Sequence, residues 1–178
     1  MARNIEIKAR IASIEAVLPR ARALADGEPV PLAQVDTFFH ATHGRLKLRQ
    51  SGDGQAELIH YQRADGPEAR ASDYVRVPVA EPALLALALA RAHGERGQVH
   101  KIRWLLHAGQ TRIHLDRVRD LGDFIELEVV LHPGQTDAQG RLIADALMQR
   151  LGLAEAPRLA VAYIDLLPAD GAQQTVTG

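Results

Sequence analysis

The segment NIEIKAR, residues 4–10, alternates polar and apolar side chains from one residue to the next. Successive side chains of an extended chain point to opposite sides, so this alternation predicts a β-strand with two different faces. One face carries both signs of charge, and the other face is aliphatic. The charged face comprises Asn4, Glu6 and Lys8, and the aliphatic face comprises Ile5, Ile7 and Ala9.

Seven further segments have the length and the bounding turn residues of β-strands. The turn at residues 51–54 (SGDG) is typical, because glycine and aspartate suit tight reversals. No repeat or linker divides the chain, so we expect one α+β domain over residues 1–178, an eight-stranded antiparallel β-barrel with peripheral helices. A closed sheet of this size encloses room for side chains or for one small ligand. The seven segments are residues 34–40, 45–50, 56–63, 72–78, 99–107, 111–118 and 123–131.

Three segments favour helices outside the barrel. Ser13 can cap a helix that runs to about residue 25, and residues 82–93 (PALLALALARAH) are rich in alanine and leucine. Thr136 or Asp137 can start an amphipathic helix that runs to Leu151. We expect the Ala/Leu-rich helix to cover one side of the sheet. The apolar segment 159–167 fits no single type of element, and we expect the tail after about residue 168 to be disordered.

The composition limits the classes of partner. The 178 residues are 47% hydrophobic and 24% charged with a net charge of −1, so no overall positive charge would hold nucleic acid or an anionic membrane. The absence of cysteine excludes disulfides and thiolate metal sites. The charged, alternating N-terminus does not resemble a signal peptide and no apolar run reaches membrane length, so we expect a cytoplasmic protein.

Charged side chains recur on one face of five predicted strands. These faces are either solvated, as in many antiparallel sheets, or they line a wet interior while the apolar faces pack outward against helices. Unpaired buried charges are costly, but opposite charges on neighbouring strands can compensate one another, and we favour the interior arrangement. The five sets are Glu6 and Lys8; Arg45, Lys47 and Arg49; Lys101 and Arg103; Arg112, His114 and Asp116; and Glu126 and Glu128.

These side chains suit a metal-dependent site for a polyanion. Glu126 and Glu128 lie about 7 Å apart along one strand, where they can share one or two hard cations, and Glu6 can complete the cluster. Oxygen ligands without cysteine favour Mg²⁺ or Mn²⁺. Arginine forks and lysine point charges suit the oxygens of a triphosphate. The pattern leaves open whether His114 is a ligand, a base or a polar lining residue.

Taken in order, these segments resemble the CYTH superfamily of triphosphate tunnel metalloenzymes, which includes class IV adenylyl cyclases, thiamine triphosphatases and inorganic triphosphatases. The resemblance covers nearly the whole chain and implies an eight-stranded tunnel. It rests on NIEIKAR (4–10), QVDTFF (34–39), GRLKLR (44–49), KIR (101–103), LDRVRDLGDFIELEV (115–129) and YIDLL (163–167). It implies metal ligation by Glu6, Glu126 and Glu128, metal ligation or ligand positioning by Asp116, catalysis by the three glutamates with Lys8, and phosphate binding by Lys8, Arg45, Lys47, Arg49, Lys101, Arg103 and Arg112.

Two positions depart from the family pattern. The family's first strand reads E-x-E-x-K, and this chain has Asn4 in place of the first carboxylate. A neutral amide is a weaker ligand, which weakens the expectation of a second cation. Ile59 is apolar where a basic residue is expected, and Arg63 can compensate from the same face as a further phosphate-binding candidate.

We therefore expect a divalent-metal-dependent enzyme that hydrolyses a small-molecule triphosphate such as ATP, thiamine triphosphate or tripolyphosphate. The alternative is a class IV adenylyl cyclase that converts ATP to cyclic AMP and pyrophosphate, which needs a purine pocket that the sequence does not identify. A second alternative, encouraged by Asn4, is a non-catalytic module that binds polyphosphate or a nucleotide. The sequence leaves a homodimer open.

Overall fold

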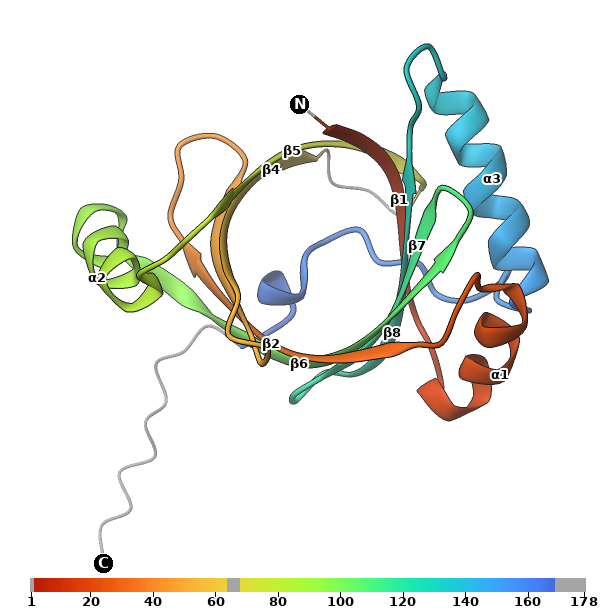
Figure 1. The fold of residues 1–178 in the computed structure, drawn as a ribbon, viewed down its shortest axis with the longest axis horizontal. Coiled ribbons are helices and arrows are strands. Elements are labelled where there is room, and N and C mark those ends of the chain that lie inside the picture. Colours follow the sequence, from red (N-terminus) through yellow and green to blue (C-terminus); the bar gives the residue numbers. More distant parts are fainter. Residues whose placement is uncertain (1, 64–67, 169–178) are drawn as a thin grey trace, which may run out of the picture.

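The computed structural model describes residues 2–63 and 68–168 and contains a closed antiparallel β-barrel (Figure 1). The strand order around the barrel is β1-β5-β4-β3-β2-β6-β7-β8. The eight predicted strands and the predicted fold class are confirmed. The strands are β1 (Ala2–Arg10), β2 (Val30–Phe39), β3 (Arg45–Ser51), β4 (Ala56–Arg63), β5 (Arg70–Pro78), β6 (Glu95–Ala108), β7 (Thr111–Val118) and β8 (Gly122–Val130).

Strands β2 and β6 each begin four residues earlier than the sequence predicts. Strand β2 begins at Val30 and contains Pro31, which precedes the predicted start of the strand at residue 34. Pro31 lies where β2 pairs with β6 alone, since pairing with β3 begins only at Gln34, and a proline is tolerated where one edge of a strand is open. Strand β6 begins at Glu95, directly after Gly94, whose positive φ of 79° ends the preceding helix and turns the chain into the sheet.

The register of β1 and β8 decides which face of the barrel is charged. Glu6 lies opposite Glu128 and Lys8 lies opposite Glu126, whereas Ile7 lies opposite Leu127. Residues opposite one another in an antiparallel pair project to the same side of the sheet, so the two strands present their charges together and their aliphatic side chains together. The charged side faces the barrel interior and the aliphatic side faces outward.

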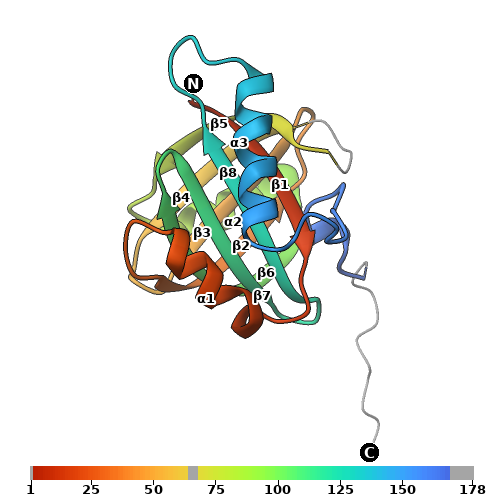
Figure 2. The same ribbon diagram turned by 90° about the vertical axis from the view of Figure 1, so that its right-hand side faces the viewer.

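Two helices cover the aliphatic side on β1, β7 and β8 (Figure 2). They are α1 (Ile14–Leu24), capped by the Ser13 hydroxyl, and α3 (Asp137–Arg150), which begins with a capping box formed by Thr136 and Gln139. A Cβ atom on Gly140 would lie 2.6 Å from Cγ1 of Ile5, so the missing side chain lets α3 approach β1 closely. The main core lies between these helices and the barrel wall. It includes Ile5, Ile7, Ile113, Leu115, Ile125, Leu127, Ala144, Leu147 and Met148.

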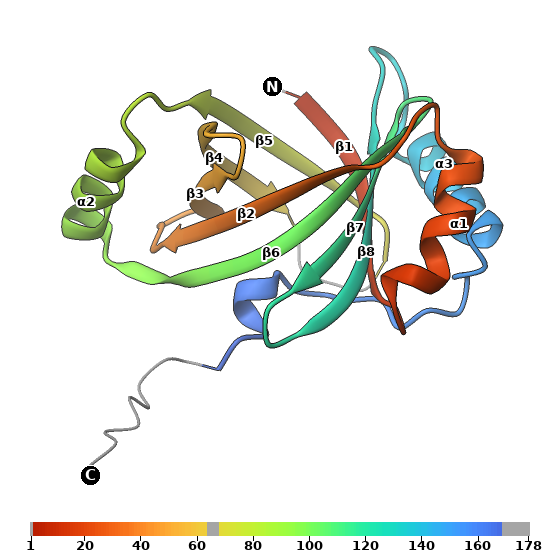
Figure 3. The same cartoon turned by 60° about the horizontal axis from the view of Figure 1, so that its bottom comes forward.

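The Ala/Leu-rich helix does not cover the sheet, so that prediction was wrong. Helix α2 (Pro82–His93) stands beside the barrel on the side away from α1 and α3 (Figures 1 and 3). None of its residues is buried, and Leu84 and Leu87 are 63% and 50% exposed. The helix lies near the β2–β3 turn, where the backbone N–H of His40 donates to the carbonyl of Gly94, and it therefore flanks the strand ends. Within the described part of the chain, no helix is both long enough and apolar enough to cross a membrane.

The C-terminal apolar segment, whose type the sequence left open, returns to the barrel. The backbone N–H of Leu159 donates to the carbonyl of Lys8 at 2.8 Å, and a short 3₁₀ turn, η1 (Tyr163–Asp165), follows. In Figure 1 this turn lies within the outline of the barrel. The predicted disordered tail after residue 168 lies outside the described residues.

Helix α3 offers a direct test of this packing. Leu147 is 7% exposed against the barrel, whereas Leu142 on the same helix is 72% exposed. Because truncation of a buried leucine removes apolar burial and leaves a cavity, we expect Leu147→Ala to lower the free energy of unfolding by about 2–5 kcal/mol. Leu142→Ala, with the same change in helix propensity, should change it by about 0.5 kcal/mol or less. Urea denaturation of both variants measures the difference, and equal losses would contradict the packing of α3.

Candidate functional site

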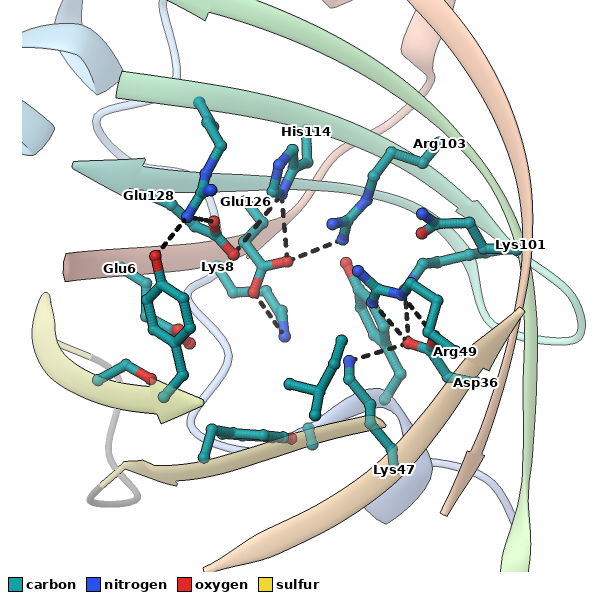
Figure 4. A pocket seen from close by; sticks show the side chains of 18 of the residues that line it. Glu6, Lys8, Asp36, Lys47, Arg49, Lys101, Arg103, His114, Glu126 and Glu128 are labelled. Atoms are coloured by element: carbon teal, nitrogen blue, oxygen red, sulfur yellow. Dashed lines mark hydrogen bonds and ion pairs between the residues drawn. The ribbon is translucent and has the colours of Figure 1, made fainter. Parts of the chain in front are cut away.

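A cavity of about 320 Å³ occupies the barrel interior, and every strand contributes to its lining (Figure 4). Side chains that alternate along each strand reach it, as the charge pattern of the sequence predicts. Most of the predicted site residues line it, together with several aromatic and aliphatic side chains. The charged and histidine side chains in its lining are Glu6, Lys8, Asp36, Lys47, Arg49, Arg76, Lys101, Arg103, His107, Arg112, His114, Glu126 and Glu128.

One side of the cavity is acidic. We call Glu6 of β1 with Glu126 and Glu128 of β8 the acidic wall (Figure 4). Burial by itself would raise the pKa of Glu126, but the cations beside it hold that pKa well below its usual range. Lys8 lies 3.1 Å from one oxygen of Glu126 and Arg103 lies 2.9 Å from the other. Glu126 therefore stays ionised inside the barrel.

His114 of β7 points toward the acidic wall. Its Nδ1 atom lies 3.6 Å from Oε2 of Glu126 and 3.9 Å from Oε1 of Glu128. One ligand atom from each of these three residues lies within 4.8 Å of the other two. A nitrogen and two carboxylate oxygens at such distances fit a divalent cation. Burial and the nearby Arg103 lower the pKa of His114, so the imidazole is neutral at neutral pH.

The facing side of the cavity is basic. We call Lys47, Arg49 and Lys101 the basic wall, and all three surround Asp36 of β2. The Asp36 carboxylate accepts from both lysines at 2.9 Å and from Nε of Arg49 at 2.7 Å. Asp36 is 1% exposed, and these cations outweigh its burial and hold its pKa well below the usual range. Burial lowers the pKa of Lys101 to about 7 and that of Lys47 to about 8.

Asp116 has a different environment from the acidic wall. Its two oxygens each accept from Arg103 at 2.6 Å, and the hydroxyl of Tyr163 donates to it at 3.0 Å. Asp116 is fully buried and does not line the cavity, and it does not belong to the three residues whose ligand atoms converge. The carboxylate holds Arg103 in place, and the role of Asp116 in metal ligation or ligand positioning stays a prediction.

The remaining predicted residues divide between the cavity and its surroundings. Arg112 lines the cavity, pairs with Glu128 at 2.8 Å and donates to the Tyr74 hydroxyl at 3.3 Å. Arg45 does not line it and instead pairs with Asp165 of η1 at 3.0 Å. The side chain of Arg63 lies outside the described part of the structure.

Sequence reasoning missed two buried residues of the site, Asp36 and Tyr163. Asp36 lies in the quoted segment QVDTFF, where it shares a strand face with Gln34 and Phe38, and that alternation is the one signal that could have identified it. The ring of Tyr163 lies under Lys8, whose Nζ is 4.3 Å from the ring centroid. Nothing in the sequence near Tyr163 indicates this contact, because it depends on the return of the C-terminal segment to the barrel.

Comparison with solved structures finds the same fold in several proteins. The PH1012 protein from Pyrococcus horikoshii OT3 superposes with a TM-score of 0.83 at 23% identity, covering 93% of this chain and 99% of that chain. A candidate adenylate cyclase from Vibrio parahaemolyticus gives a TM-score of 0.73 at 22% identity, covering 92% and 96%. A candidate adenylyl cyclase from Hippeastrum, described as having a dominant triphosphatase activity, gives 0.65 at 12% identity, covering 93% and 94%.

Comparison of sequences supplies the family. No curated protein matches this chain significantly. A sequence model of the CYTH domain, however, matches residues 2–163, which include all eight strands, the three α-helices and both walls of the cavity. The chain therefore belongs to the CYTH domain family.

Proposed function

We propose that this protein binds a triphosphate in its barrel and hydrolyses it with the help of a divalent cation. The observation that carries the proposal is the pairing of two opposed surfaces in one cavity, a basic wall and an acidic wall with converging ligand atoms. A polyphosphate with its cation needs both kinds of surface. Membership of the CYTH family supports the proposal, as does the triphosphatase activity described for the Hippeastrum protein.

The basic wall would hold the phosphate chain. Three cations share the single carboxylate of Asp36, so positive charge is in excess on this side of the cavity. Asp36 fixes their side chains before a ligand arrives, which lowers the entropy that binding must overcome. Arg49 can offer a planar fork to phosphate oxygens, and the lysines offer point charges.

The acidic wall, with His114, would hold the cation. The fit rests on two observations, the converging donor atoms and the buried Nδ1 of His114, which makes no hydrogen bond in the described structure. Mg²⁺ or Mn²⁺ in this position would neutralise phosphate oxygens and lower the pKa of an attacking oxygen. Asn4 also lines the cavity beside Glu6, and its buried Oδ1 accepts no hydrogen bond from any described residue.

Three basic side chains beside the acidic wall couple the binding of the divalent cation to the binding of the triphosphate. Lys8, Arg103 and Arg112 compensate Glu126 and Glu128 in the ligand-free protein. A divalent cation must compete with them for the carboxylates, whereas a polyphosphate gives them other oxygens to bind. The cation and the triphosphate should therefore bind more tightly together than either binds alone.

One observation favours an organic triphosphate as a second candidate substrate class, and with it the cyclase reaction. Tyr61, Tyr74 and Ile59 line the cavity from β4 and β5 and offer aromatic and apolar surface for a base or a thiazole ring. Whether water or a ribose hydroxyl attacks then decides between hydrolysis and cyclisation.

Product analysis separates these reactions. We expect ATP, thiamine triphosphate or tripolyphosphate, incubated with the protein and Mg²⁺ or Mn²⁺, to yield orthophosphate and the corresponding diphosphate. Ion-exchange chromatography resolves the products. Cyclic AMP with pyrophosphate would overturn hydrolysis in favour of cyclisation. Tight tripolyphosphate binding without turnover of any substrate would make the protein a binding module.

Glu126→Gln tests the acidic wall, because it removes one negative charge at nearly constant shape. We expect the metal-dependent turnover to fall by about a hundredfold or more, while the circular dichroism spectrum stays unchanged. Glu28→Gln is the matched control, since the Glu28 side chain is 84% exposed and lies outside the cavity lining. Full activity in Glu126→Gln would show that this carboxylate has no role in the reaction.

The lowered pKa of Lys101 predicts proton uptake when phosphate binds. With a pKa of about 7, the Lys101 amine is mostly neutral at pH 8 in the free protein. Phosphate oxygens next to the amine favour its charged form, raise that pKa and draw in a proton. Calorimetry of metal-free tripolyphosphate binding at pH 8, in two buffers of different ionisation enthalpy, measures this uptake. We expect Lys101→Met to take up fewer protons than the wild type or the exposed control Arg22→Met, and an unchanged proton count would contradict a phosphate contact at Lys101.

A further inference from the structure

We infer that His114 is a nitrogen ligand of the cation, and that the site therefore selects Mn²⁺ over Mg²⁺. The inference rests on the proposed function, which gives the cavity a cation, and it specifies which donors hold that cation. The strand pattern left the role of this residue open between metal ligand, base and polar lining residue.

The first argument is that the Nδ1 atom of His114 lacks a hydrogen-bond partner among the described residues. The His114 side chain is 5% exposed, and its Nδ1 atom makes no hydrogen bond with the described residues. Buried polar atoms of this kind are nearly always satisfied, and an unsatisfied one costs about 1–3 kcal/mol. An atom that is left without a partner in the ligand-free protein can gain one when a cation binds.

The second argument is the direction in which this atom points. Nδ1 faces both Glu126 and Glu128, and its distances of 3.6 and 3.9 Å exceed the range of a hydrogen bond. Two carboxylates at similar distances from one nitrogen leave space for an ion between them. A simple histidine–glutamate hydrogen bond would instead bring one oxygen to about 3 Å.

The third argument is the rigidity of the arrangement. His114 and Glu126 are direct partners in the β7–β8 ladder, and Glu128 is two residues further along β8. Both strands are backed by the main apolar core through Ile113, Leu115 and Leu127, which are fully buried. The donor atoms are therefore held on sheet positions and do not depend on a loop.

A donor set with an imidazole nitrogen has a predictable preference. Mg²⁺ prefers an octahedron of oxygen atoms and keeps several water molecules, so it gains little from a nitrogen ligand. Imidazole suits first-row transition ions, for which affinity rises from Mn²⁺ onward along the series. Removal of His114 should therefore weaken Mn²⁺ binding much more than Mg²⁺ binding.

The experiment is a Mn²⁺ titration of the full-length protein with tripolyphosphate present, followed by pulsed electron paramagnetic resonance. We expect the wild type to show a nitrogen coupling to Mn²⁺, and His114→Phe to lose it with an affinity for Mn²⁺ that is weaker by about tenfold or more. In competition experiments with Mg²⁺, we expect the Mg²⁺ affinity of His114→Phe to differ from that of the wild type by about threefold or less. His132→Phe, which removes an exposed histidine of the β8–α3 connection, is the matched control.

A second variant separates ligation from packing. His114→Asn places an oxygen near the position of Nδ1, so we expect it to abolish the nitrogen coupling, restore part of the Mn²⁺ affinity lost in His114→Phe, and keep Mg²⁺ binding at or above the wild-type level. A wild type without nitrogen coupling, or equal weakening of both ions in His114→Phe, would overturn the inference. Metal-dependent hydrolysis without the coupling would leave the proposed function standing alone, and a coupling without turnover would leave the ligand assignment standing alone.

Discussion

Charges inside a closed barrel need opposite charges within a few ångströms, because the interior offers too little water to solvate them. This requirement governs the structure. The acidic wall is compensated by Lys8, Arg103 and Arg112, and the basic wall is compensated by Asp36. The compensating groups come from different strands, so each strand of the barrel must keep its register for the interior to remain neutralised.

The basic wall and the acidic wall differ in how completely their charges are compensated. On the basic wall one carboxylate serves three cations, which leaves positive charge for a ligand. On the acidic wall Glu126 and Glu128 already have cations beside them, and the imidazole of His114 is their neutral neighbour. Ligand binding at such a site is an exchange of partners among charges that are already ordered, and little reorganisation of the backbone is needed.

Much of the fold could be predicted from the sequence, because the alternation of polar and apolar residues in a strand involves only residues that are neighbours in the sequence. The same alternation identified the charged faces of β1, β3, β6, β7 and β8. It gave only a weak signal for Asp36, which stands as a single acid in an otherwise uncharged strand face and whose partner Lys101 lies 65 residues further along the chain. The roles of Asp116 and Tyr163 depend on a hydrogen bond between residues 47 positions apart, and such contacts leave no local pattern.

The position of α2 was mispredicted for a related reason. Its alanines and leucines favour a helix but do not state which surface the helix meets. The short link from Gly94 into β6 fixes it near the strand ends, and its leucines remain exposed. Composition was sufficient to predict the element and insufficient to place it.

Helices α1 and α3 cover only one side of the barrel, and this affects how the two walls of the cavity are supported. Helices α1 and α3 support β1, β7 and β8, which carry the acidic wall, whereas β3 and β4 form a single layer whose outward residues Leu58 and His60 are partly exposed. The strands that carry the acidic wall therefore have a layer of helices packed behind them. The arc that carries Lys47 and Arg49 lacks this backing by α1 and α3, so the two walls of the cavity differ in the packing behind them.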